Sequence, residues 1–312
     1  MSTLSQNEPE TAEGTAAMKV GCAALYPITR YGFPYSFDDY IRALDEMQAA
    51  GFDAVELEIN VDLDLDEYRE RIKEVQQKLI ALELRLSAVI GVVQQAFSTD
   101  EAAADAHVER FDVLTQFIAD VGCDVACICA YMPKEIEMVA GTEVYRGSPA
   151  TRIRVPPGFD WQAFWDNAVA RFRQMARIAA RRGQRLVIEN RVGDFVNTSD
   201  GGLKLIEDAG EPNGGLLLDV AHLHATKEFF ELVIPKLGQR LMYVHLADND
   251  GSFSHHLPAG QGNVDFPSLF RTLKAAGYSG YTNVDYGGVP PDQIWEEVKR
   301  GREYFEGLIA QL

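Results

Sequence analysis

The chain has 312 residues, an apolar fraction of 46% and a formal net charge of −18, with an isoelectric point near 4.7. A protein with this negative charge repels phosphate backbones and anionic membrane surfaces at long range. Neither nucleic acid nor a membrane is therefore expected as a partner. No apolar run approaches the ~20 residues that a membrane-spanning helix needs, and the apolar fraction is that of a globular protein with a sizeable core.

The first 17 residues are small and polar and are predicted to form a disordered tail. They lack the basic segment and apolar stretch of a secretory signal, so a cytoplasmic protein is expected. Residues 18–312 are predicted to form a single domain. The cysteines lie in or beside strand-like runs without the paired spacing of a zinc ribbon, which predicts buried free thiols in a reducing compartment: Cys22, Cys123, Cys127 and Cys129.

Strand-like runs and helical segments alternate along the rest of the chain. The predicted strands are residues 19–26, 54–59, 84–93, 124–130, 186–189, 216–219, 242–245 and 283–285. The predicted helices are residues 36–50, 66–82, 101–121, 161–182, 200–209, 227–237, 267–276 and 291–312. Strict alternation of eight strands with eight helices predicts an α/β fold, a single (β/α)8 TIM barrel. A doubly wound open sheet is the alternative, but no glycine-rich phosphate turn follows the first strand.

A long connection, residues 131–159, follows the fourth predicted strand. It carries Tyr131, Tyr145 and Arg146 among other aromatic and basic residues, so it is not a flexible Gly/Ser linker. Loops that follow barrel strands lie on the active face, and connections this long are uncommon in compact domains. A lid or a subunit contact is therefore expected, with simple surface decoration as the alternative.

Four potential metal ligands each end one of the last four predicted strands: Glu189, Asp219, His245 and Asp285. The carboxyl ends of barrel strands share one mouth, so these side chains are expected to converge there. Any one of them could instead cap a helix or join an ion pair, but their recurrence at four successive strand ends favours a divalent metal. Three carboxylates and one imidazole suit Mn most, with Mg, Co or Zn as alternatives.

Further polar residues surround this predicted centre. His222 comes three residues after Asp219, and His256 precedes a loop long enough to fold over the mouth, so both are expected to contact substrate. Glu56 and Glu58 lie on the same side of the second strand, and one of them, assigned to Glu58, is expected to support the site and bind substrate. His107 lies mid-helix among charged residues and is expected at the surface.

Four short motifs carry a resemblance to a known family. They are Ile-Glu-Asn at 188–190, Asp-x-x-His at 219–222, Val-His-Leu-x-Asp at 244–248 and Gly-x-Gly-x-Val-Asp-Phe at 260–266. Together they resemble the xylose-isomerase-like TIM-barrel superfamily, which contains sugar isomerases, ketose 3-epimerases, and inosose and dehydroshikimate dehydratases. The resemblance implies that Glu189, Asp219, His245 and Asp285 bind one divalent metal, and that Glu189 and Asp285 move the proton.

The predicted function is therefore a metal-dependent isomerase or epimerase that acts on a sugar or a related hydroxy-carbonyl compound. Asp285 is one methylene shorter than the Glu usual at its position in the epimerase branch, so a dehydratase or other lyase acting on a keto-polyol or keto-glycoside is the alternative. A barrel that only binds a sugar or a partner is a third. The family's endonuclease branch is excluded, because residues 60 and 91–95 offer none of its extra histidines. The resemblance also implies a homodimer or homotetramer.

Overall fold

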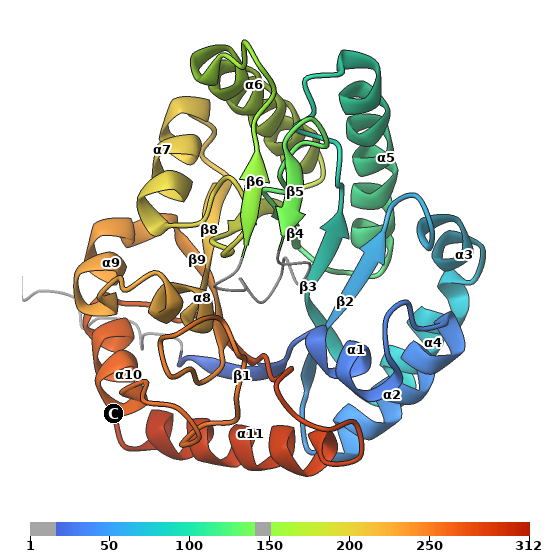
Figure 1. Ribbon diagram of the computed structural model, residues 1–312. Coiled ribbons are helices and arrows are strands. Elements are labelled where there is room, and N and C mark those ends of the chain that lie inside the picture. The colour runs from blue at the N-terminus through green and yellow to red at the C-terminus, as the bar shows by residue number, and fades with distance from the viewer. Residues whose placement is uncertain (1–16, 141–150) are drawn as a thin grey trace, which may run out of the picture.

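The structure is a computed structural model that describes residues 17–140 and 151–312 (Figure 1). Eight parallel strands close into a barrel in the order β1-β10-β9-β8-β7-β4-β3-β2. These strands are β1 (Lys19–Cys22), β2 (Ala54–Asn60), β3 (Arg85–Val92), β4 (Val125–Cys129), β7 (Arg185–Glu189), β8 (Gly214–Asp219), β9 (Leu241–Leu246) and β10 (Tyr281–Val284). The predicted TIM barrel is confirmed.

The helices form a ring outside the barrel (Figure 1). They are α1 (Leu25–Tyr31), α2 (Phe37–Ala49), α3 (Leu65–Glu70), α4 (Ile72–Ala81), α5 (Glu101–Asp120), α6 (Trp161–Ala180), α7 (Ser199–Ala209), α8 (Val220–Ala225), α9 (Phe230–Leu237), α10 (Phe266–Ala275) and α11 (Ile294–Ala310), with a 3-10 turn at Gly238–Arg240. The predicted start of α2 is confirmed, since the Ser36 hydroxyl accepts the Asp39 N–H and the Asp39 carboxylate accepts the Ser36 N–H.

Alternation along the strands separates a polar interior from an apolar layer beneath the helices. Glu56 in β2 contacts His245 in β9 across the barrel, so its side chain lies inside. Leu57 and Ile59 alternate with Glu56 and Glu58 and are fully buried on the other side, against the helices. The polar functional residues can therefore lie inside the barrel while the hydrophobic core holds the ring of helices in place.

Several predicted boundaries were wrong for local reasons. The first strand ends at Cys22 and residues 25–31 form α1, although they were predicted as strand and loop. The predicted helix 66–82 is divided at Arg71, whose φ of −101° and ψ of 18° leave the helical range. Arg71 instead lies over the Phe37 ring, 3.8 Å from its centroid.

The long connection after β4 is not wholly irregular. It contains two strands, β5 (Glu137–Ala140) and β6 (Arg152–Arg154), which pair antiparallel. Tyr145 and Arg146 lie outside the described residues, as do residues 1–16 of the predicted tail. The proposed lid or subunit contact therefore stays a prediction.

Burial confirms one prediction about side chains and corrects another. All four cysteines are buried free thiols. His107 is 5% exposed rather than at the surface, because it faces inward from α5 and lies 3.4 Å from Asp62. Within residues 17–140 and 151–312, no helix is long and apolar enough to cross a membrane.

Candidate metal centre

The structure brings the four predicted ligands together at the carboxyl ends of neighbouring strands. His245 Nδ1 lies 3.7 Å from a Glu189 oxygen, 3.8 Å from an Asp219 oxygen and 3.6 Å from an Asp285 oxygen. All four residues are buried. Parallel strand register accounts for this convergence, since Asp219 pairs with His245 between β8 and β9.

The orientation of His245 fits a metal. Its Nε2 lies 2.9 Å from Glu56 Oε1, and its Nδ1 is a buried polar atom with no hydrogen-bond partner. A buried nitrogen without a partner costs free energy unless it is bound, and here it faces three carboxylates. A carboxylate that accepts from the other ring nitrogen of a ligating histidine, as Glu56 does here, commonly fixes the orientation and the tautomer of the ring. Three oxygens and one nitrogen form a donor set that divalent ions accept.

A buried polar layer supports Glu56 from below. Glu56 Oε1 also accepts from Asn283 Nδ2 at 2.8 Å, and its Oε2 accepts from the Ala24 N–H at 3.0 Å. Asn283 lies opposite Gly21 in the register of β1 and β10, where a Cβ on residue 21 would come within 2.3 Å of Asn283 Oδ1. Gly21 therefore leaves the space in which Asn283 reaches Glu56.

The charged groups of the centre shift one another's pKa values. Burial favours a neutral His245, but Glu56 and Asp285 outweigh it and raise the His245 pKa well above its ordinary value. Burial likewise opposes ionisation of Asp219, yet His222 and His256 lower its pKa below the usual range. Burial raises the pKa of Asp285 to about 7. A divalent ion would replace the proton on His245 as the positive charge of the cluster.

His256 lies at the centre of the cluster, in direct contact with two predicted ligands. Its Nε2 is 3.2 Å from Asp219 Oδ2 and 3.4 Å from Asp285 Oδ2. Its φ of 52° is in the left-handed region, and its carbonyl accepts the N–H groups of Gly287 and Gly288, each at 3.0 Å. Strained backbone held this firmly is common at functional sites.

The loop that carries His256 is fixed by a buried carboxylate. Asp248 accepts the backbone N–H groups of Gly260, Gly262 and Val264 at 2.8, 2.9 and 3.0 Å. Asp248 and Leu257 also exchange backbone hydrogen bonds of 2.8 and 2.9 Å. The loop therefore holds the imidazole over the mouth.

The other two predicted substrate residues occupy different sides of the mouth. His222 packs edge-on against His256 with ring centroids 4.9 Å apart, and burial lowers the pKa of His222 to about 4, so it is neutral at pH 7. Burial raises the pKa of Glu58 to about 7, while the nearby Arg191 opposes the shift. Of the two glutamates considered on β2, Glu56 bonds the predicted ligand His245, and Glu58 lies near the charges of Glu189 and Asp285.

Sequence reasoning missed two contributors to the mouth. The Cys129 thiol, at the end of β4, donates to Glu189 Oε2 at 3.1 Å. Arg191 donates two 2.9 Å hydrogen bonds to the buried Asp194, and its guanidinium lies 4.5 Å from the Tyr131 ring centroid. The sequence positions of both residues could have indicated a place at the mouth, because Cys129 ends a strand and Arg191 follows Glu189 by two residues.

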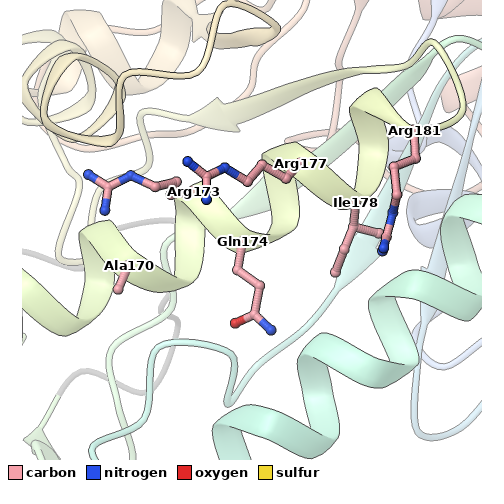
Figure 2. A pocket seen from close by; sticks show the side chains of 6 residues that line it. All are labelled: Ala170, Arg173, Gln174, Arg177, Ile178 and Arg181. Atoms are coloured by element: carbon pink, nitrogen blue, oxygen red, sulfur yellow. The ribbon is translucent and has the colours of Figure 1, made fainter.

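A surface hollow lies along the second half of α6. Figure 2 shows Arg173, Arg177 and Arg181 along this helix, lining a cavity of about 490 Å³. Arg173 donates to the Ala209 carbonyl at 2.8 Å, and Arg177 Nε donates to a Glu211 oxygen at 2.7 Å. Arg173 and Arg177 therefore link α6 to the end of α7, and Arg181 lies 3.7 Å from Asp112 of α5, so structural roles account for all three.

Comparison with known proteins places this chain in a family. The family model described as xylose isomerase-like TIM barrel matches residues 44–304. The chain belongs to this family. Two curated members share 26% identity with it. They are an L-ribulose 3-epimerase from Mesorhizobium japonicum, over 76% of this chain and 72% of the relative, and a ketose 3-epimerase from Arthrobacter globiformis, over 84% and 81%.

A solved structure of another xylose isomerase-like barrel supports the fold. The structure of an L-ribulose 3-epimerase superposes with a TM-score of 0.72 at 20% identity, covering 94% of this chain and 95% of that one. At that identity the likeness shows the barrel architecture.

Proposed function

We propose that this xylose isomerase-like barrel is a divalent-metal-dependent isomerase or epimerase acting on a sugar or a related hydroxy-carbonyl compound. The observation that carries the proposal is the unpartnered Nδ1 of His245, 3.6 to 3.8 Å from oxygens of three carboxylates. The two epimerase relatives, each aligned over more than two thirds of its length, supply the reaction class. The proposed ligands are Glu189, Asp219, His245 and Asp285, with Mn as the proposed ion.

Glu189 is the proposed base. A bound divalent ion would polarise the substrate carbonyl and lower the pKa of the carbon acid beside it. One Glu189 oxygen faces His245 and the other accepts from the Cys129 thiol, so the carboxylate is held from both sides. Glu189 then takes the proton from the carbon next to the carbonyl, and Asp285 returns one from the opposite side.

His222 and the open side of the mouth are proposed to hold the substrate. The Nδ1 of His222 accepts the Val192 N–H at 3.3 Å, so in the neutral ring the proton sits on Nε2 and can be donated to a substrate hydroxyl. Glu58 and His256 are proposed as the other substrate contacts. Glu58 lies near Arg191. The Glu58 carboxylate and the Arg191 guanidinium together offer an acceptor and a donor for further hydroxyls.

A lyase is the second candidate, and one observation favours it. Asp285 Oδ2 lies 3.4 Å from His256 Nε2, so the short carboxylate can pair with an imidazole rather than reach a substrate carbon. A site with one effective base suits proton removal followed by loss of a leaving group. The epimerase is preferred because the two relatives described above, which align over 76% and 84% of this chain, carry that activity in their names.

Metal analysis of purified protein tests the proposal. Protein prepared with Mn²⁺ should hold close to one ion per chain, and His245→Leu, which removes the nitrogen ligand, should hold far less. Turnover of a ketose panel should disappear on chelation and return on adding Mn²⁺. A wild-type protein that binds no divalent ion under these conditions, with no rescue of turnover, would overturn the proposal.

A further inference from the structure

A second cavity of about 680 Å³ lies between the first half of α6 and α7, and its lining extends from Trp161 and Thr198 to Arg173 and Asp208. The two helices are neighbours in the ring (Figure 1). Helices of a barrel begin on the side of the strand carboxyl ends, so the end of this cavity at Trp161 and Thr198 lies toward the mouth. Its volume is in the range of small-molecule pockets.

Two tryptophans form one wall of this cavity. The Trp161 and Trp165 rings are stacked, with centroids 5.8 Å apart and planes 28° from parallel. Trp161 is 53% exposed, while Trp165 is 6% exposed and donates its Nε1–H to Asp208 at 2.7 Å. The inner ring is therefore fixed, and the outer ring presents a large apolar surface to solvent. An aromatic surface left open beside polar groups is typical of a binding site.

The charged side chains that line the cavity are two cations, Arg173 and Lys204, and two anions, Asp166 and Asp208. Lys204 lies over the Trp165 ring, 5.4 Å from its centroid, and its ammonium donates to Asp208 at 2.6 Å, which uses its charge. Gln162 donates to Asp166 at 2.8 Å, and Asn197 lines the opposite wall. With equal numbers of cations and anions in its lining, the cavity suits a neutral ligand that has many donors and acceptors.

The cavity shares a loop with the metal centre. The segment after β7 carries Arg191 and Asp194 at the mouth and then Phe195 and Asn197 in the cavity wall. The Phe195 ring packs edge-on against Phe164 of α6, with centroids 5.2 Å apart. A ligand in the cavity would therefore lie beside the loop that borders the catalytic mouth.

We propose that the Trp161 cavity is an accessory saccharide-binding site. A sugar in its ring form has an apolar C–H face that stacks on an exposed indole, and hydroxyls that satisfy mixed amide and carboxylate groups. A neutral polyol also agrees with the paired charge of Lys204. The inference does not rest on the proposed reaction, because it concerns binding in this cavity and needs neither the metal nor Glu189.

Binding of two sugars locked in ring form, methyl β-D-glucopyranoside and methyl β-cellobioside, tests the inference by calorimetry and tryptophan fluorescence. Wild type should bind at least one of them, and Trp161→Ala should weaken that binding about tenfold, or about 1.4 kcal/mol. Trp161→Phe should keep most of the affinity. Phe229→Ala is the matched control, because Phe229, the residue before α9, is 69% exposed and does not line the cavity. This variant should bind the sugars like wild type.

Three results would overturn the inference. The first is that wild type binds neither sugar, and the second is that Trp161→Ala binds them as tightly as wild type. The third is that Trp161→Ala loses self-association while wild type shows no sugar binding, which would assign Trp161 to a protein contact. Glu189→Gln should retain the binding in full. Failure of the catalytic proposal would therefore leave this measurement unaffected.

Discussion

Replacing Glu56 by Gln tests how the candidate metal centre is organised. Glu56 Oε1 receives His245 Nε2 and Asn283 Nδ2, while Oε2 receives the Ala24 N–H. A glutamine has the same shape but one acceptor oxygen, and its amide group would meet either the Ala24 N–H or the other two donors. At least one buried donor then loses its acceptor.

Two effects of different size follow from Glu56→Gln. A buried donor without an acceptor costs about 1–3 kcal/mol of stability, which should lower the midpoint of thermal unfolding in EDTA. Loss of the carboxylate behind a ligating histidine typically weakens metal binding about 10- to 100-fold. Competition for Mn²⁺ against a chromophoric chelator measures the second effect directly.

Glu58→Gln is the matched control for this experiment. It makes the same chemical change two residues along β2, but outside the hydrogen bonds that hold His245, so its effect on Mn²⁺ affinity should be smaller. If Glu56→Gln binds Mn²⁺ as tightly as wild type, or no more weakly than Glu58→Gln, then Glu56 does not orient a metal-binding His245 and the reasoning is refuted.

Three further predictions concern single residues. Glu189→Gln should fold and reduce turnover by about 10²- to 10⁴-fold, and a variant with more than about a tenth of the wild-type rate would argue against a base at this position. Asp285→Glu should raise epimerisation at equal metal content, because the longer carboxylate extends past His256, and an unchanged rate would show that side-chain length is not limiting. Burial lowers the pKa of His107, so the unfolded chain binds its proton first and stability should fall as the pH drops below about 6.5. Urea unfolding between pH 7 and pH 5 should show a shallower loss for His107→Gln, and parallel curves for the two proteins would contradict this assignment.

The barrel was predictable because each strand repeats the same local signal. Leu186 to Ile188 and Leu216 to Leu218 are short apolar runs that end in a carboxylate, and the regular spacing of such runs defines a parallel sheet. Convergence of the four strand-end residues follows from that topology. The break at Arg71 was not predicted, because the apolar residues Tyr68, Ile72 and Val75 keep helical spacing across it.

The partners of the candidate centre were harder to predict than its members. Alternation placed Glu56 and Glu58 on the same side of β2, but the depth of each inside the barrel depends on strand tilt and register. His256 was expected to touch substrate, and its contacts with Asp219 and Asp285 arise from a loop whose path is set by Asp248. His107 looked exposed because its neighbours in sequence are charged, whereas burial depends on the face of the helix.

Solvent deuterium exchange tests the central claim most directly, which is that a metal centre built around His245 lets Glu189 move a proton next to a carbonyl. Wild-type protein loaded with Mn²⁺ in D2O should introduce deuterium at that carbon in at least one member of a ketose panel, with no elimination product. Glu189→Gln with equal metal content should introduce none. Metal-loaded wild-type protein that leaves every C–H bond of the panel unexchanged, or exchange that persists undiminished in Glu189→Gln, would contradict the account.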